Sequence, residues 1–135
     1  MPQSTPPITS LVISLATSVL NEIGCHYPKP VYLNSLLYAM RASHLLVHEH
    51  PSLILRINDK PISEHSHDFI VQDKDPLIFN LLVASTITQA NVNCVRACVN
   101  AHRRAAGGAL INFGDQRLNW MHIVQSQHNY YRSNV

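Results

Sequence analysis

The sequence predicts a mainly α-helical fold: a compact bundle of about four helices with a small β-hairpin inserted between the second and third helices. Apolar residues recur at helical spacing near the N-terminus and again after a proline-rich connector. A longer stretch begins after an Asp-Pro pair and ends at two glycines, which are typical helix boundaries. The chain has 135 residues, the size of one ordinary domain, so we expect residues 1–135 to form a single domain.

The first predicted helix runs from about Ile8 to Ile23, with apolar residues at i, i+3, i+4 and i+7 throughout. Thr5 can act as the N-cap, with Pro6 at the first helical position and Gly24 after the last. The opposite face carries small uncharged side chains, which allow another helix to approach closely. We therefore predict an interaction face composed of Ser10, Ser14, Thr17 and Ser18.

The second predicted helix follows the connector Tyr27–Pro30 and covers about Val31–Glu49, because Pro51 disfavours helix in the residues just before it. The stretch Ser52–Asp59 alternates apolar side chains with others and predicts a strand. A second short strand is predicted over His67–Asp73. These two strands would form the hairpin.

The third predicted helix covers Leu77–Ala106, with Asp75–Pro76 as its start and Gly107–Gly108 as its end. The β-branched run Thr86–Thr88 is where a bend or break in this helix is expected.

The C-terminal third of the chain is less regular in pattern. The apolar run Ala109–Phe113 stays open between helix and strand. Asp115 can cap a last helix over about Gln116–His128. This helix would complete the bundle.

The composition indicates an unusual surface, because only 13% of residues are charged and lysine and glutamate are scarce. Helical surfaces in water normally use these two residues, so we expect much of the exterior to be covered by a second copy or a protein partner. Compositional bias is the alternative, for example an overlapping reading frame in a compact viral genome. The net charge of +2 implies no strong overall field for nucleic acid or membranes.

Cysteine and histidine give weak signals for a metal site. Cys94, Cys98 and His102 follow one helix face at i, i+4 and i+8, and the first and third lie too far apart to share one zinc ion. Core packing is the favoured interpretation, and zinc binding with histidines from elsewhere stays open. His65, His67 and Asp68 in "HSHD" offer metal ligands too, although a solvated loop is favoured. We predict no cofactor and no metal. Whether the nine histidines form a pH switch also stays open.

The arginines of the third predicted helix suggest contact with phosphates. Cations near a helix C-terminus interact favourably with its dipole, which is the structural explanation for them. The functional alternative is a basic face that clamps a nucleic-acid backbone without reading its sequence. The predicted nucleic-acid-binding residues are Arg96, Arg103, Arg104 and Arg117.

No catalytic motif or small-molecule site is evident, so the sequence predicts that the protein is not an enzyme. The leading hypothesis is a non-enzymatic helical interaction protein that binds itself or a protein partner, with a viral accessory protein in host–virus interaction as one such role. The alternative is a nucleic-acid-binding accessory protein. No segment is expected to span a membrane. Three cysteines favour a reducing compartment, so we expect a cytoplasmic location, with the nucleus as second choice.

Overall fold

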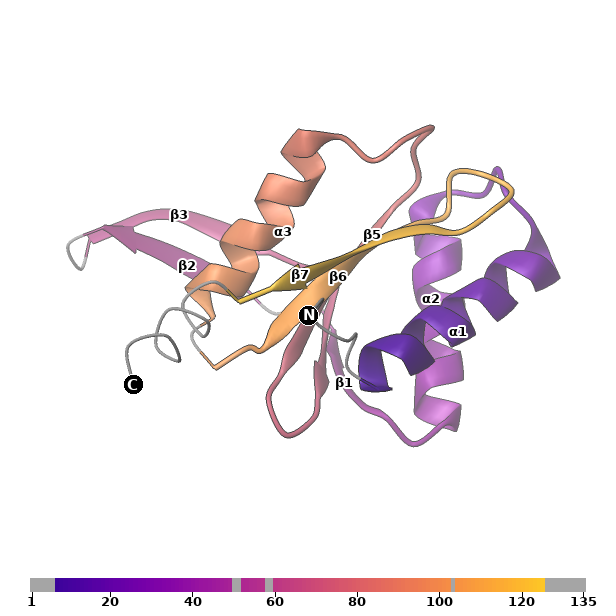
Figure 1. The fold of residues 1–135 in the computed structure, drawn as a ribbon, viewed down its shortest axis with the longest axis horizontal. Coiled ribbons are helices and arrows are strands. Elements are labelled where there is room, and N and C mark those ends of the chain that lie inside the picture. The colour runs from indigo at the N-terminus through magenta and orange to yellow at the C-terminus, as the bar shows by residue number, and fades with distance from the viewer. Residues whose placement is uncertain (1–6, 50–51, 58–59, 103, 126–135) are drawn as a thin grey trace, which may run out of the picture.

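The structure, a computed structural model, describes residues 7–49, 52–57, 60–102 and 104–125 and shows an α/β fold (Figure 1). The mainly α-helical bundle is therefore wrong: within the described residues there are three helices and a five-stranded mixed sheet. The elements in chain order are α1 (Pro7–Ile23), α2 (Lys29–Ala42), β1 (Leu46–Glu49), β2 (Ser52–Ile57), β3 (Lys60–Ser66), β4 (Phe69–Gln72), β5 (Leu77–Leu82), α3 (Gln89–Ala101), β6 (Gly107–Asn112) and β7 (Asn119–Val124).

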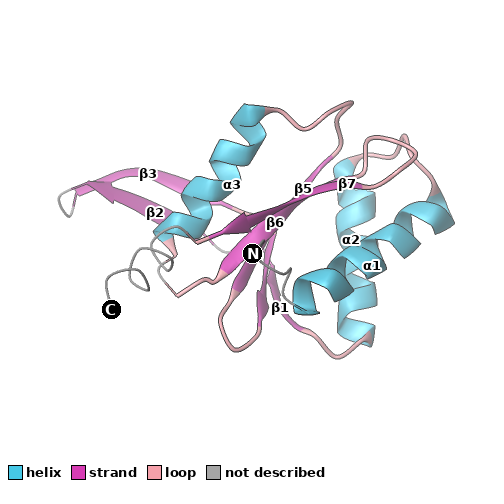
Figure 2. Cartoon of the chain, viewed as in Figure 1, coloured by secondary structure: helices cyan, strands magenta, loops and turns pink. Residues whose placement is uncertain are grey.

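The main sheet has the strand order β1-β4-β5-β6-β7. Its only parallel pair is β5 with β6, and α3 makes the crossover between them. The neighbouring pairs β1/β4, β4/β5 and β6/β7 are antiparallel. Strands β2 and β3 form a separate two-stranded ribbon that projects from the sheet beside α3 (Figures 1 and 2).

The helices cover both faces of the sheet, with α1 and α2 on one side and α3 on the other (Figure 2). Strand β5 contributes to both cores, because successive side chains point to opposite faces. Leu77, Phe79 and Leu81 pack with α1 and α2, and Ile78 packs with α3. A strand buried on both faces is apolar almost throughout and does not alternate.

That double burial explains the largest error of the sequence analysis. The apolar run Leu77–Leu82 is the central strand β5, and only Gln89–Ala101 of the predicted long helix is helical. The helix begins where the β-branched run ends: Thr88 is the N-cap of α3 and forms a capping box with Asn91. The apolar residues of β5 and those of α3 together gave the spacing expected of a single long helix.

The two glycines expected to end the long helix instead begin β6. A Cβ atom on Gly108 would clash with the backbone carbonyl of Ile78 on the parallel neighbour β5. Glycine is therefore required by the close approach of two central strands. The run Ala109–Phe113, left open from the sequence, lies mostly in β6.

The second and last predicted helices also differ from the structure. Helix α2 ends at Ala42, and His44 adopts a positive φ of 65° that turns the chain into β1. The helix predicted over Gln116–His128 is instead a loop followed by the edge strand β7 (Asn119–Val124), and residues 126–128 lie outside the described ranges.

A hairpin does lie between α2 and α3, but its strands are β2 and β3, whereas His67–Asp73 mostly belongs to the main sheet as β4. The proposed caps of the first helix, Thr5 and Pro6, are outside the described residues. Within the described ranges, no helix combines the length and the apolar character that crossing a membrane requires.

Candidate functional site at the carboxyl ends of β5 and β6

The carboxyl ends of the parallel strands β5 and β6 form one edge of the sheet. In open α/β sheets, ligands bind outside the carboxyl ends of the strands. Asp68 lies at this edge, because β4 begins at Phe69 and runs antiparallel to β5. The backbone N–H of Asp68 donates to the Asn80 side-chain Oδ1 at 2.8 Å, which fixes Asp68 beside β5.

The Asp68 carboxylate is nearly buried and both of its oxygens have partners. Oδ2 accepts a hydrogen bond from the Leu81 backbone N–H at 2.6 Å. Oδ1 lies 2.9 Å from Nζ of Lys29, and the side chain of Asp68 is only 10% exposed. A carboxylate in such a place requires a compensating cation, and Lys29 supplies it.

Lys29 is the first residue of α2, and aromatic packing fixes this helix end. The Tyr32 hydroxyl donates to the backbone carbonyl of Gly24 at 2.7 Å, and its ring stacks on Phe113 at a centroid distance of 4.7 Å. The N-terminus of α2 is thereby tied to the segment just after β6. A lysine in the first turn interacts unfavourably with the helix dipole. The ion pair with Asp68 compensates for this and explains why a lysine stands at this position.

Asn112, the last residue of β6, holds the two loops of this edge together. Its Oδ1 accepts from the N–H groups of Ala84, at 3.1 Å, and Gly114, at 2.9 Å. Its Nδ2 donates to the Ala84 carbonyl at 3.0 Å. The loop before α3 and the loop before β7 therefore form one rigid rim.

A polar hollow of about 410 Å³ opens between these loops and β7. Trp120 is 37% exposed, so its indole face is available for stacking with a ligand ring. Hydroxyl and amide side chains on the same wall can donate hydrogen bonds. The lining residues are Ser85, Thr86, Ile87, Asp115, Asn119, Trp120 and Met121.

His67, next to Asp68, is buried without a hydrogen bond from either ring nitrogen to any described residue. Burial, together with the nearby His102, lowers the pKa of His67 from 6.5 to about 4, against the opposing effect of Asp68. The imidazole is therefore neutral at physiological pH. The sequence had placed His67 and Asp68 in a solvated loop, which is wrong, because both are buried.

The predicted arginines do not form one patch. Arg96 is exposed on α3, and Arg104 is exposed just before the start of β6. Arg117 is exposed in the loop after β6, at the carboxyl edge, so β6 separates it from Arg104. Arg103 lies outside the described residues. Of the three that the structure describes, only Arg117 is placed at the edge that holds Asp68.

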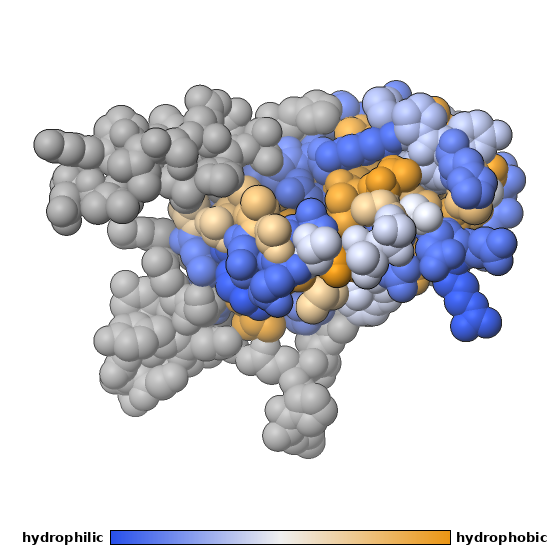
Figure 3. Space-filling view, turned by 90° about the horizontal axis from the view of Figure 1, so that it is seen from above, coloured by the Kyte–Doolittle hydropathy of each residue, from blue (hydrophilic) through white to orange (hydrophobic). Residues whose placement is uncertain are grey.

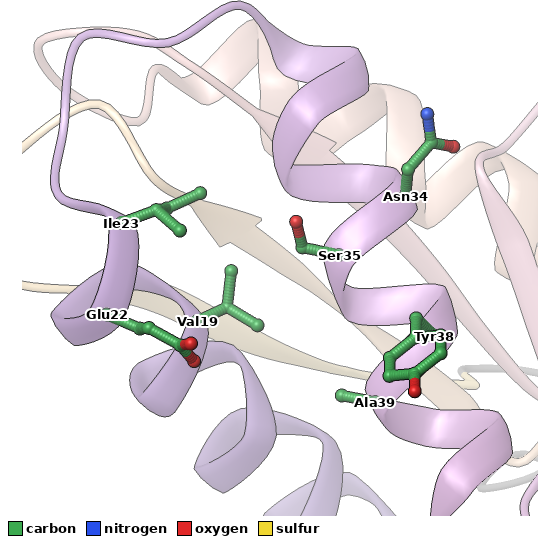
Figure 4. A pocket seen from close by; sticks show the side chains of 7 residues that line it. All are labelled: Val19, Glu22, Ile23, Asn34, Ser35, Tyr38 and Ala39. Carbon is green, nitrogen blue, oxygen red and sulfur yellow. The ribbon is translucent and has the colours of Figure 1, made fainter.

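The predicted interaction face Ser10, Ser14, Thr17 and Ser18 is exposed along α1. Beside it, a groove of about 600 Å³ lies between α1 and α2, with Val19 and Ile23 facing Ser35 and Ala39 (Figure 4). Viewed from above, the surface shows an apolar patch bordered by hydrophilic residues (Figure 3). Nothing in the described residues identifies what would cover the face or the groove.

The cysteines are divided between core and surface. Cys98 packs in the core on the α3 side, where burial and the neighbouring Cys94 raise the pKa of its thiol. Cys94 is exposed. Among the described residues, no three His, Cys, Asp or Glu side chains come together as metal ligands.

The comparison with known families decides the relationship. Residues 6–123 match the PD-(D/E)XK nuclease superfamily, which is most of the chain. The chain belongs to this superfamily. Its membership overturns the predictions of a non-enzymatic helical interaction protein and of a protein that is not an enzyme, because the superfamily is one of nucleases. A viral accessory role has no support in these findings, and an oligomer or protein partner is unconfirmed.

A solved structure titled "Crystal structure of SSO0001" resembles this fold with a TM-score of 0.52 and 9% sequence identity. The alignment covers 76% of this chain and 54% of that chain, so the present chain spans about half the length of that protein. The likeness concerns the fold alone. No curated protein sequence matches the chain significantly.

The name of the superfamily spells an acidic residue followed two positions later by lysine, and this tripeptide occurs nowhere in the sequence. The residues two positions before the three lysines, Lys29, Lys60 and Lys74, are Tyr27, Asn58 and Gln72. On β5, beside Asp68, stand Asn80 and, two positions on, Leu82. An acid and a lysine at these two places would complete the motif, so this edge departs from the superfamily's pattern.

The residues at this edge do not fit a divalent metal ion. Nucleases commonly clamp such ions with carboxylates, and Mg²⁺ requires open oxygen ligands in a near-octahedral arrangement. Here one oxygen of Asp68 is paired with Lys29 and the other with the Leu81 N–H. The Asn80 amide oxygen is engaged by the Asp68 N–H. The sequence motif HSHD offers Asp68 as a possible metal ligand, but no sequence pattern points to Lys29, which is a single lysine before a proline.

Proposed function

We propose that this chain binds nucleic acid through its phosphodiester backbone, at the sheet edge where Lys29 and Asp68 meet. The observation that carries the proposal is the Lys29 ammonium, held 2.9 Å from the Asp68 carboxylate at the carboxyl end of the parallel strands in a nuclease-superfamily chain. Any member that acts on nucleic acid must first hold its backbone. An ammonium at a rigid edge is a suitable hydrogen-bond donor to a phosphate oxygen.

The surroundings support the same ligand. Arg117 is exposed in the loop after β6 and takes part in neither of the two ion pairs among the described residues. Trp120, in the neighbouring hollow, can stack on a base, which holds single strands without reading their sequence. The edge thus combines cations for phosphates with an aromatic face for a base.

The binding test uses the intrinsic fluorescence of Trp120, the one tryptophan in the chain. Titration with single-stranded and double-stranded DNA and RNA at about 50 mM salt should quench this fluorescence, and the affinity should fall steeply as salt is raised. Lys29→Gln should lower the salt slope by about one, because one phosphate contact is lost, whereas Lys29→Arg should retain it.

The matched control is Arg96→Gln with Arg104→Gln, which removes two exposed arginines away from this edge. These substitutions should leave the slope almost unchanged. A loss confined to this double variant would place nucleic acid at Arg96 or Arg104 instead. No binding to any of the nucleic acids at low salt would refute the proposed function.

Cleavage is measured in the same samples, because the superfamily is one of nucleases. Asp68 is the buried carboxylate that this edge holds beside Lys29, so any cleavage by this chain should be lost in Asp68→Asn. Asp73→Asn, in the exposed turn after β4, should leave cleavage unchanged. Equal cleavage by the wild type and Asp68→Asn would show that the activity does not belong to this site.

A further inference from the structure

We propose that the Lys29 ammonium is a built-in cation at this edge: it bridges the Asp68 carboxylate and a phosphodiester oxygen, so that no divalent metal ion is needed there. The nucleic-acid part of this inference rests on the proposed function, and the part about the cation does not.

A metal ion at Asp68 would meet two carboxylate oxygens that already have partners. Oδ1 faces the ammonium of Lys29, and Oδ2 accepts from the Leu81 N–H inside the sheet edge. Turning Oδ2 towards an ion would leave a buried N–H without an acceptor, which costs about 1–3 kcal/mol. A dication beside the ammonium would also meet like-charge repulsion. The ammonium therefore competes directly with any ion for this carboxylate.

The pair differs from an ordinary surface ion pair. Arg41 and Glu49 also lie 2.9 Å apart, but their side chains are 49% and 41% exposed. Such exposed pairs contribute little to stability, because water solvates both charges. Asp68 is 10% exposed, so its charge depends on Lys29 far more than Glu49 depends on Arg41.

The ammonium still has donors to offer a ligand. A lysine ammonium carries three N–H donors, and the Lys29 side chain is 43% exposed although its partner is buried. One side of the ammonium therefore faces Asp68 while another reaches solvent. A carboxylate alone would repel a phosphate, whereas the pair presents N–H donors to it. This is the bridging role that a divalent cation has between a carboxylate and a phosphate.

The role of Lys29 as the cation at Asp68 is tested first by titrating the wild-type protein with MnCl₂ in a calorimeter. We expect no stoichiometric binding that depends on Asp68: the wild type and Asp68→Asn should give the same heats. One equivalent of Mn²⁺ bound by the wild type and lost in Asp68→Asn would overturn the inference. This comparison needs no redesigned site.

The converse variant rebuilds a carboxylate cluster. Lys29→Glu combined with Asn80→Asp places acidic groups around Asp68, and Mn²⁺ should then bind at least roughly tenfold more tightly than to the wild type and raise the melting temperature. Lys74→Glu, the same lysine-to-glutamate substitution at an exposed residue in the turn after β4, is the control and should gain no such response. An equal gain in both variants would contradict the inference.

The nucleic-acid arm compares binding in EDTA and in MnCl₂ at matched ionic strength. The affinity should be the same in both conditions. Binding that is abolished by EDTA and restored by Mn²⁺ would overturn the inference while supporting the proposed function. Absence of binding in both conditions would refute the proposed function. The Mn²⁺ titration would still test whether Lys29 takes the place of a metal ion at Asp68.

Discussion

His67 and Asp68 are neighbours in the sequence, and both are buried, but they remain so by different means. Asp68 pairs with the Lys29 ammonium and accepts a hydrogen bond from the Leu81 N–H. His67 has no hydrogen-bond partner among the described residues and is held in its neutral form. The local sequence HSHD predicts neither environment, because each depends on residues that the fold brings from other parts of the chain.

The buried His67 should make stability depend on pH. Its pKa is about 4 in the folded protein against 6.5 when unfolded, so the unfolded chain takes up the proton first as pH falls. The stabilisation is complete above pH 6.5 and is lost progressively down to pH 4, by up to about 3 kcal/mol. Urea unfolding at a series of pH values measures this decline.

The His67→Gln variant isolates this contribution, because other titrating groups, such as His122, are present in both proteins. Its free energy of unfolding should fall less steeply between pH 6.5 and pH 4. Parallel curves for the wild type and the variant would show that His67 is not held neutral by burial.

Asn112 should be among the most sensitive polar residues. Asn112→Ala removes the partner of three backbone groups on Ala84 and Gly114, and we expect a loss of about 3 kcal/mol in the free energy of unfolding. Asn119→Ala is the control, because Asn119 is exposed on the paired strand, and it should change stability by less than about 0.5 kcal/mol. Similar losses in both would contradict the role given to Asn112.

At the scale of elements, the sequence predicts the first helix well, because one of its faces meets water. The helix expected over 8–23 corresponds to α1, because its apolar stripe alternates with an exposed face. Strand β5 could not be predicted in the same way, since burial on both faces removes the alternation that identifies a strand. The candidate site was missed for a related reason: Lys29 and Asp68 meet only after α2 and β4 pack at one edge.

The close pairing of β5 and β6 can be tested with two glycines. Gly108→Ala forces a Cβ atom against the Ile78 carbonyl, and we expect a loss of roughly 3 kcal/mol or failure to fold. Gly24→Ala is the comparison: it has open space but a φ of +80°, so the loss should be about 1–2 kcal/mol. Thermal unfolding of both variants measures the difference, and an equal loss would mean that the strands do not approach so closely.

At the scale of the whole molecule, the shortage of lysine bears directly on the site. A chain with three lysines has few ways to spell an acid and a lysine two residues apart, and this one has none. From the sequence alone, the shortage predicts an exterior covered by a second copy or a protein partner, and such a partner is unconfirmed. The fold gives it a different importance, because one of these lysines, Lys29, is placed against the single carboxylate that β4 brings to the edge.

The central claim is that Lys29 occupies the cation position at Asp68. The most direct test is the crystal structure of the wild-type protein soaked in MnCl₂, with diffraction recorded where manganese scatters anomalously. We expect Nζ of Lys29 within hydrogen-bonding distance of Asp68 Oδ1 and no anomalous peak beside that oxygen. A manganese peak coordinated by Asp68, with the Lys29 side chain turned away, would contradict the account.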